Sequence, residues 1–558
     1  MLTIPEIQKQ LISQKADAYI ITRNNMFLGQ DILPEENKIK SLTGFSGSAG
    51  NLIIFRDKAY LLVDGRYDIQ ARSQTNNDQI EIVVTRDSIG SWIYNNIDQS
   101  CKFLYNPWCH SISEVDYWKR ALSNHEFIED KSDLLGEIIF QRETEIFELE
   151  EQFAGVSSDE KTSYLTEFCQ KNKLDAYLIC ESDSVSWLMN LRSNLLEHTP
   201  ILRAYALVSA QGEISLFTND FSTLSNELDL YKGKTIGVAY NRCPKKLQSI
   251  MKEKHIWIHN TNNPIVEWKS IKNPIEISGC KTAHIRDGAA VCRLLNWLEN
   301  NWQSADELSV IAKLHDFRQQ GQHYYSESFA TIAGFADNGA VVHYQATTET
   351  NKKLCDGSLL LIDSGAQYLD GTTDITRTIA IGTPSPEMIS SYTQVLKAHI
   401  AAATAIFPED TCGSVIDTIS RHILWQYGKD YAHGTGHGVG HFLNVHEGPQ
   451  SLSSKSQYPL KKDMIVSIEP GFYKENEYGI RIENLVIIEQ TSTEFISPML
   501  KFSPLTMVPF DINLIDKSLL TTSEINYIND YHQKVIDNIY HLLDPETQNW
   551  LKKSCQPI

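Results

Sequence analysis

The sequence of 558 residues lacks several patterns that would assign it at once to a class of protein. None of its 10 cysteines forms a C-x-x-C pair, so neither a thiolate zinc site nor a disulfide framework is indicated. No apolar run approaches the roughly 18 residues of a membrane span, and the first residues do not resemble a secretory signal. We therefore expect a cytoplasmic protein with reduced thiols and no membrane partner.

Basic side chains are also scarce relative to acidic ones. The chain has 50 Lys and Arg against 70 Asp and Glu, which gives a formal net charge of −20. A nucleic-acid partner would require a basic surface, so none is expected. Apolar residues make up 42% of the chain, which excludes disorder as its main state, and the length predicts about three domains.

Three common catalytic signatures are absent. The chain has no H-E-x-x-H pattern, no P-loop, and no G-x-G-x-x-G fingerprint, because Val439 stands where the third glycine would be. Four histidines and four glycines are instead concentrated between His433 and His446. Glycine destabilises helices and exposes the backbone, so such a stretch indicates backbone or imidazole groups that face a ligand.

Two segments of the chain resemble each other. Residues 7–22 (IQKQLISQKADAYIIT) and 165–180 (LTEFCQKNKLDAYLIC) both show a helical pattern followed by a short apolar strand after an aspartate. We infer two related α/β domains in tandem. A hairpin is expected from 52–55 and 59–63, and a charged, helical connector around 131–161.

The second half of the chain opens and closes with helical patterns. Prolines near 264 and 274 mark a boundary, and an amphipathic helix is predicted over 276–298. Thr521 and Glu524 form a capping box before a C-terminal helix with apolar periodicity up to Leu542.

Acidic residues stand at the ends of predicted strands between these helices. The apolar run 358–362 ends at Asp363, a turn at Asp370-Gly371 follows, and Asp374 begins an alternating segment. This is the pattern of a hairpin, which places Asp363 and Asp374 on neighbouring strands. Two buried carboxylates repel each other unless a cation lies between them.

The same pattern recurs downstream at Glu469, after 464–468, and at Glu483, within a strand expected over 479–488. Four carboxylates and an imidazole from the histidine cluster form a mixed oxygen and nitrogen donor set. Such a set suits Mn²⁺, Co²⁺, Fe²⁺ or Zn²⁺, and five side chains make two ions plausible.

At these residues the sequence resembles the pita-bread metallopeptidases, the fold of methionine aminopeptidase, prolidase and aminopeptidase P. The blocks DSGAQYLDGTTDITRT at 363–378 and HGTGHGVG at 433–440 are especially similar to aminopeptidase P, as are FLNVHEGP at 442–449 and EPGFY at 469–473. Similarity to the long, three-domain members extends to TGFSGSAG at 43–50 and VDGRY at 63–67.

The resemblance implies two tandem creatinase-like N-terminal α/β domains followed by a C-terminal pita-bread metallopeptidase domain. The expected bounds are 1–140, 141–268 and 269–558. It also implies an Xaa-Pro aminopeptidase that acts on peptides with proline at the second position through a hydroxide bridging two metal ions. The ions are expected to be Mn²⁺, with Co²⁺ or Zn²⁺ as alternatives, and the assembly a homodimer.

Site roles are likewise implied by position. The ligands would be Asp363, Asp374, His437, Glu469 and Glu483, with Asp374 and Glu483 bridging the ions. The substrate-binding or catalytic residues would be Glu469, His343, His433, His446 and Arg481. His441 departs from the family pattern, and we expect it to face solvent without a role in the site.

Two alternatives remain open at the level of the sequence. A prolidase would share the metal ligands but would cleave Xaa-Pro dipeptides. A non-catalytic pita-bread protein would act as an interaction module, although all five ligand positions are filled here.

Overall fold

The computed structural model describes residues 2–29, 31–75, 79–136, 144–218, 221–491 and 498–558. The chain folds into two compact units. The first comprises Met1–Glu148, Val156–Leu196 and Ile201–Ile265, and the second comprises Leu149–Gly155, Glu197–Pro200 and Val266–Ile558. The second unit therefore includes two short segments that come from the first half of the sequence.

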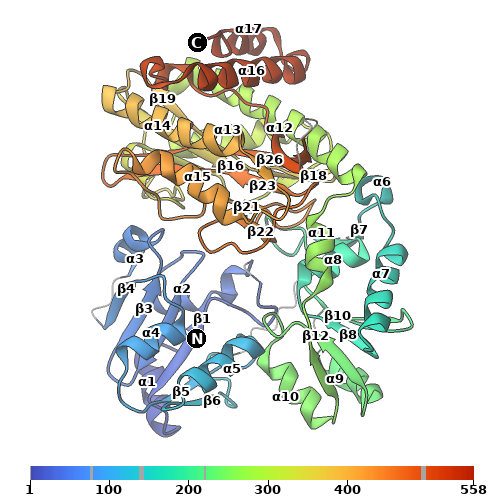
Figure 1. Ribbon diagram of the computed structural model, residues 1–558. Helices are drawn as coiled ribbons and strands as arrows, with labels where there is room; N and C mark the ends of the chain where they lie inside the picture. Colours follow the sequence, from blue (N-terminus) through green and yellow to red (C-terminus); the bar gives the residue numbers. More distant parts are fainter. Residues whose placement is uncertain (1, 30, 76–78, 137–143, 219–220, 492–497) are drawn as a thin grey trace. The chain divides into compact units, whose positions relative to one another are not determined.

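The first unit contains a six-stranded sheet with the order β4-β3-β2-β1-β5-β6 (Figure 1). Its strands are β1 (Ala18–Thr22), β2 (Asn51–Phe55), β3 (Ala59–Val63), β4 (Ile80–Val84), β5 (Lys102–Tyr105) and β6 (Glu126–Glu129). The β2–β3 pair is antiparallel with Ile54 opposite Ala59, which confirms the predicted hairpin.

β1 is buried on both sides because helices cover both faces of this sheet. Tyr19 and Ile21 belong to one core with α1, whereas Ala18 and Ile20 belong to another core, as the two-residue period of a strand requires. The helices are α1 (Ile4–Ser13), α2 (Lys38–Thr43) and α3 (Asp68–Gln74), which contribute to the first core, and α4 (Ile89–Asn96) and α5 (Ile112–Ala121), which contribute to the second.

A second sheet in the first unit repeats this arrangement. Its order is β11-β10-β8-β12-β13, from β8 (Ala176–Ile179), β10 (Tyr205–Ser209), β11 (Ile214–Phe217), β12 (Thr235–Val238) and β13 (Trp257–Asn260). In both sheets a helix, α1 or α7 (Ser158–Lys171), leads into a central strand that is antiparallel to one neighbour and parallel to the other. The prediction of two tandem α/β domains is confirmed.

The other elements of the first unit surround this second sheet. They are α8 (Ser182–Met189), β9 (Leu191–Ser193), α9 (Phe221–Leu228) and α10 (Lys245–Glu253), and β9 pairs with β7 (Ile146–Glu148). The predicted helical connector over 131–161 is helical only in part, and α7 begins within this range at Ser158. Between Lys131 and Ser157 it forms only β7 and the short α6 (Glu151–Ala154), whereas residues 137–143 lie outside the described residues.

The second unit is built around several small antiparallel sheets. They are β20-β27-β26-β23-β21-β22, β15-β16-β19, β14-β17-β18 and β24-β25. The strands are β14 (Tyr324–Glu327), β15 (Ile332–Phe335), β16 (Ser358–Ser364), β17 (Ala366–Tyr368), β18 (Gly371–Thr372), β19 (Ile375–Ile381), β20 (Ile406–Pro408), β21 (Gly436–Gly438), β22 (Glu447–Leu452), β23 (Ile465–Ile468), β24 (Gly471–Lys474), β25 (Tyr478–Arg481), β26 (Asn484–Gln490) and β27 (Met499–Pro504).

Helices surround these strands, as Figure 1 shows. They are α12 (Pro274–Asn301), α13 (Glu307–Arg318), α14 (Pro386–Ala403), α15 (Gly413–Trp425), α16 (Thr522–Ile539) and α17 (Pro545–Ser554). The boundary between the two units falls within α11 (Pro264–Ser270), after Ile265. The predicted helix 276–298 is α12, and the Thr521 side chain accepts a hydrogen bond from the Glu524 amide at the start of α16. Both predictions are confirmed.

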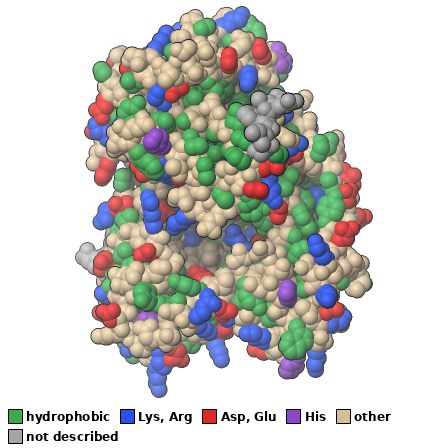
Figure 2. Space-filling model, in the orientation of Figure 1, with side chains coloured by type: hydrophobic (Ala, Val, Ile, Leu, Met, Phe, Trp, Pro, Cys, Tyr) green, Lys and Arg blue, Asp and Glu red, His purple; other side chains and the backbone are tan. Residues whose placement is uncertain are grey.

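The surface carries the excess acidic charge together with many basic side chains. Figure 2 shows Lys and Arg as well as Asp and Glu on each unit, with hydrophobic side chains between them. Over the described ranges, no helix is both long and apolar enough for a membrane crossing.

Candidate metal centre

Asp363 and Asp374 lie on the neighbouring strands that the sequence predicted. β16 and β19 are antiparallel, with Asp363 opposite Thr376 and Ser364 opposite Ile375, and Asp374 directly precedes β19. The short β17–β18 hairpin forms the connection between them. Both aspartates are less than 10% exposed, at 9% and 4%, so their carboxylates are withdrawn from bulk water.

The second pair of acids is positioned differently from the prediction. Glu469 follows β23, as expected, but the single strand predicted over 479–488 is divided into β25 and β26. The chain changes partners at this point, because the Ile482 amide donates to the Pro470 carbonyl and the Glu483 amide donates to the Thr376 carbonyl. Glu483 therefore lies at a break between two sheets, beside the start of β19.

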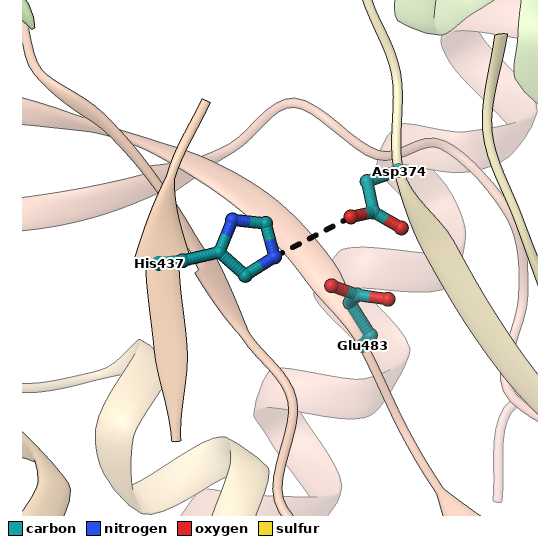
Figure 3. A group of neighbouring side chains, drawn as sticks. All are labelled: Asp374, His437 and Glu483. Carbon is teal, nitrogen blue, oxygen red and sulfur yellow. Dashed lines mark ion pairs between the residues drawn. The ribbon is translucent and has the colours of Figure 1, made fainter. Parts of the chain in front are cut away.

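His437 completes the cluster from β21. Figure 3 shows the side chains of Asp374, His437 and Glu483 pointing toward one another from three separate segments. A potential ligand atom from each lies within 4.8 Å of the others. His437 Nε2 is 3.5 Å from Asp374 Oδ2 and 3.5 Å from Glu469 Oε1.

Hydrogen bonds fix which nitrogen of His437 faces the acids. Its Nδ1 lies 2.9 Å from the Gly438 carbonyl oxygen, which can only accept, so Nδ1 bears the proton. Nε2 then presents its lone pair to Asp374 and Glu469. Metal-binding histidines are commonly fixed in this way by a backbone carbonyl on the other nitrogen.

The buried acids raise one another's pKa. Burial is the largest cause for both Asp374 and Glu483, and the neighbouring carboxylates raise each pKa further. The pKa of Glu469 is also raised by burial, with His437 and Arg481 acting in the opposite direction. A cluster of this kind is costly unless protons or cations neutralise it.

The unsatisfied atoms of the cluster fit a hard divalent cation. Oδ1 of Asp363 and Oδ1 of Asp374 are buried and have no hydrogen-bond partner among the described residues. Buried carboxylate oxygens normally have partners, so these two are free to coordinate an ion. The donor set of carboxylate oxygens and one imidazole nitrogen fits Mn²⁺, Co²⁺ or Zn²⁺.

Arg481 holds one of these acids in place. Its Nη2 donates to Asp363 Oδ2 at 2.5 Å and its Nε donates to Thr376 Oγ1 at 3.2 Å. The Thr376 hydroxyl in turn donates to Glu483 Oε2 at 2.8 Å. Burial alone would lower the pKa of Arg481, but Tyr473 and Asp363 raise it, so the guanidinium remains charged.

Tyr473 is a functional candidate that sequence reasoning missed. Its hydroxyl accepts from Arg481 Nη1 at 2.6 Å and lies 2.8 Å from His433 Nε2, to which its proton can be donated. The only signal in the sequence was its place in the EPGFY block. His433 Nδ1 contacts the Gly434 carbonyl at 2.8 Å, and burial lowers the pKa of His433, so this imidazole is neutral.

The other histidines assigned from the sequence also lie near the cluster. The ring centroid of His446 is 4.3 Å from that of His437, with the two rings nearly perpendicular. His433 Nδ1 is 4.0 Å from Glu469 Oε2. His343 is close enough that its charge further lowers the pKa of His433.

The prediction for His441 is wrong, because its side chain is buried and only 2% exposed. Its Nε2 lies 3.0 Å from the Phe153 carbonyl oxygen and its Nδ1 lies 3.4 Å from Cys280 Sγ. Phe153 belongs to the short segment Leu149–Gly155, which joins the second unit from the first half of the chain. The sequence offered no signal for this contact between residues 288 positions apart.

The glycines of this stretch have a steric role in addition to the one expected from the sequence. Three of the four, Gly436, Gly438 and Gly440, are buried rather than exposed. A Cβ atom on Gly436 would lie 1.9 Å from the Ser467 carbonyl oxygen, and one on Gly438 would lie 2.3 Å from that of Glu447. These glycines allow neighbouring strands to approach closely around His437.

The fold and the buried acid cluster define a metal-dependent hydrolase, and the family comparisons agree. Residues 278–490 match "Metallopeptidase family M24", and 498–558 match "C-terminal region of peptidase_M24". Residues 4–134 and 140–276 each match "Creatinase/Prolidase N-terminal domain".

Relatives over the whole length define the family more narrowly. The chain is 34% identical to Xaa-Pro aminopeptidase 1 of Dictyostelium discoideum, covering 100% of this chain and 96% of that protein. It is 32% identical to aminopeptidase P1 of Lotus japonicus, covering 98% and 97%. The chain belongs to the Xaa-Pro aminopeptidase family of M24 metallopeptidases.

Solved structures support the same fold. X-prolyl aminopeptidase from Caenorhabditis elegans, described as a cytosolic enzyme with a di-nuclear active site, superposes with a TM-score of 0.91 at 29% identity, covering 97% of this chain and 95% of that one. A prolidase from Thermococcus sibiricus matches with a TM-score of 0.52 at 21% identity, covering 64% of this chain and 98% of that one, and shows the shared fold alone.

Proposed function

We propose that this chain is an aminopeptidase that hydrolyses the bond between an N-terminal residue and a following proline with two divalent metal ions. The observation that supports this most directly is the convergence of Asp374, His437 and Glu483, with partnerless oxygens on Asp363 and Asp374. The whole-length similarity to Xaa-Pro aminopeptidases supports the substrate class.

The proposed ligands are the five residues predicted from the sequence. They are Asp363, Asp374, His437, Glu469 and Glu483, of which Asp374 and Glu483 would be shared between the ions. When bound, a pair of ions would supply a nucleophile at neutral pH and stabilise negative charge on the substrate carbonyl. We propose Mn²⁺ as the natural metal, with Co²⁺ and Zn²⁺ as alternatives.

Glu469 is the proposed proton carrier. Its carboxylate lies beside the other proposed ligands, with Oε1 3.5 Å from His437 Nε2, where it could accept a proton and pass it to the leaving proline nitrogen. The Ser467 hydroxyl donates to its Oε1 at 3.1 Å and fixes the orientation of the carboxylate.

Histidines and Arg481 complete the proposed substrate site. His446 and His343 would donate hydrogen bonds to the oxyanion that develops on the scissile carbonyl. His433 and Arg481 would contribute to substrate binding. His433 would lie at the edge of the substrate site, and Arg481 would act by holding Asp363. A proline amide has no N–H, so a site without an acceptor for that proton can favour it.

Further parts of the proposal concern the whole protein. We propose domain bounds of 1–140, 141–268 and 269–558, supported by the separate sheets within residues 1–268. A cytoplasmic location is supported by the cytosolic relative from Caenorhabditis elegans, and a homodimer by family resemblance. Sedimentation of the purified chain would test the dimer.

The deciding experiment compares peptide substrates with Mn²⁺ present. Ala-Pro-Ala should be cleaved to Ala and Pro-Ala, whereas Ala-Ala-Ala should not. Cleavage of the dipeptide Ala-Pro alone would instead identify a prolidase. A purified protein that binds no metal and never becomes active with Mn²⁺ would identify a non-catalytic interaction protein.

The proton-transfer role has its own test. Glu469→Gln should lower kcat on Ala-Pro-Ala by about 10²- to 10⁴-fold, because the amide cannot shuttle the proton. Metal content is measured in parallel by elemental analysis. Near-normal turnover by a metal-loaded variant would contradict the assignment.

A further inference from the structure

Three buried charged side chains meet at Glu447, the residue that follows His446 in the chain. The Glu447 carboxylate is 2.5 Å from Lys272 Nζ through Oε1 and 2.9 Å from Lys269 Nζ through Oε2. All three side chains are almost fully buried, with at most 1% of each exposed. Lys272 Nζ also donates to the Lys269 carbonyl oxygen at 2.7 Å, which ties the two lysines together.

Such a cluster is expensive to bury. Removing ions from water carries a large desolvation cost, and apolar residues of similar volume often give equal or greater stability. What the ionic arrangement supplies is orientation, because each carboxylate oxygen faces its own ammonium group and the side chain cannot rotate without breaking an ion pair.

Glu447 is a direct neighbour of a site residue along the chain. Glu447 directly follows His446 in the chain and begins β22, where it pairs with Gly438 of β21. Gly438 in turn directly follows His437. The approach of the two strands is close, because a Cβ on Gly438 would lie 2.3 Å from the Glu447 carbonyl oxygen.

The register between β21 and β22 also shifts at this point. His437 lies opposite Ser451, whereas Gly438 lies opposite Glu447, so the strands leave regular pairing between these two positions. Such an irregularity disrupts the ladder locally and changes the direction in which a side chain points. The ion pairs of Glu447 therefore provide an anchor next to His446 where the ladder is disrupted, and the His446 ring is in contact with that of His437.

We propose that Glu447, held by Lys269 and Lys272, is a positioning residue that fixes the His446 imidazole against His437 for the reaction. This inference rests on the proposed function for its kinetic consequence. Its structural content, the placement of one imidazole by a buried carboxylate, does not depend on the substrate.

The first variant is Glu447→Gln, which keeps the size of the side chain and removes its charge. The expected result is a kcat on Ala-Pro-Ala that is about 10- to 100-fold lower, the range typical for outer groups that orient the functional residues of a metal site. KM and bound metal should remain within about threefold of the wild type, since the ligands themselves are intact.

A second variant protects the test against misfolding. Glu447→Gln combined with Lys269→Met leaves one lysine and no carboxylate, so the cluster keeps its net charge of one positive unit. This double variant should fold and still show the lower kcat. A matched control is Glu524→Gln, which breaks the 2.8 Å Lys397–Glu524 pair between α14 and α16 of the same unit and should leave kcat unchanged, since neither residue is assigned a role in the site.

A double-mutant cycle then asks whether Glu447 acts through His446. Glu447→Gln should slow the His446→Ala variant by less than about twofold, because the group that it positions is already absent. An equal loss in both backgrounds would overturn the proposal, as would a wild-type kcat in Glu447→Gln.

A crystal structure of the metal-loaded variant with Glu447→Gln and Lys269→Met gives a readout that does not depend on activity. The His446 ring should move away from His437 or occupy more than one position. An unmoved, well-ordered ring would overturn the proposal. Failure of the wild-type chain to cleave Ala-Pro-Ala would refute the proposed function instead, and the crystallographic result would still decide the positioning role.

Discussion

At the scale of the single residue, the site is built from carboxylates whose charged forms are unfavourable to bury side by side without a cation. Asp374 and Glu483 are buried beside each other, and their raised pKa values reflect burial first and mutual repulsion second. The ion that the site would bind offsets this cost, so binding energy and folding energy are coupled.

This coupling predicts that one substitution has opposite effects on the stability of the metal-free and the metal-bound protein. Asp374→Asn should leave the thermal midpoint of the EDTA-treated protein equal to or higher than that of the wild type, because a repulsive charge is removed. The increase in midpoint on adding Mn²⁺ should be lost. Differential scanning calorimetry with EDTA and with Mn²⁺ measures both, and a wild-type increase with Mn²⁺ would contradict the role of Asp374 as a ligand.

A buried histidine that is not among the proposed ligands predicts acid sensitivity. His532 Nε2 accepts a hydrogen bond from the Phe510 amide at 3.1 Å, and burial lowers its pKa to about 4. Below pH about 6.5 the unfolded chain binds a proton at this position and the folded chain does not. Stability is therefore lost as the pH falls from about 6.5 toward 4.

Replacing this histidine should reduce the acid sensitivity. Between pH 7 and pH 5 the loss of unfolding free energy should be about 2 kcal/mol smaller in His532→Asn than in the wild type. Urea denaturation at the two pH values measures it. His541→Asn, at an exposed position, is the control and should change the pH dependence little. An unchanged loss in His532→Asn would show that His532 is not the responsible group.

At the scale of the element, glycines determine how closely the strands of the site approach. None of the glycines at 434, 436, 438 and 440 has a positive φ, so their backbone conformation alone does not require glycine. The requirement is steric at three of the positions and weak at Gly434, whose nearest neighbour to an added Cβ would be the Leu452 carbonyl oxygen at 3.3 Å.

This difference predicts unequal effects of two neighbouring substitutions. Gly436→Ala should displace β21 from β23, because its Cβ would lie 1.9 Å from the Ser467 carbonyl oxygen, and should lower both metal binding and thermal stability. Gly434→Ala should retain most of both. Elemental analysis and the thermal midpoint compare the variants, and equal behaviour would contradict the steric explanation.

At the scale of the whole molecule, the second unit is not a continuous segment of chain. It includes Leu149–Gly155 and Glu197–Pro200, whose backbone carbonyls accept hydrogen bonds from residues of the C-terminal half. Asn273 Nδ2 donates to the Ala154 carbonyl at 2.9 Å, and Gln367 Nε2 donates to the His198 carbonyl at 3.1 Å.

A chain cut near the start of the family match at 278–490 should therefore be less stable than the full chain. A chain of residues 266–558 lacks both segments and leaves Asn273, Gln367 and His441 without these partners. Its thermal midpoint with Mn²⁺ should lie below that of the full chain, and its solubility should be lower. If the second unit unfolds at the same thermal midpoint in both proteins, these segments contribute little to its stability.

Much of the architecture could be predicted from local patterns. Hydrophobic periodicity and capping located α12 and α16, and the alternation of residues around the Asp370-Gly371 turn located β16 and β19. Local chemistry determines these features, because helices and hairpins form between residues close in sequence.

The errors arose where distant segments decide the outcome. The break between β25 and β26 depends on Pro470 and Thr376, which the local apolar pattern does not reveal. The burial of His441 depends on Phe153. The ion pairs of Glu447, which no local pattern indicated, depend on lysines at 269 and 272.

The sequence by itself therefore determined the donor set, since residue types and their places after strands already indicated a cluster of acids and histidines for a divalent ion. Only the tertiary structure decided which atoms face that ion. Hydrogen bonds to Gly438, Arg481 and Thr376 orient the ligands, and these bonds exist only after segments far apart in the chain have packed together.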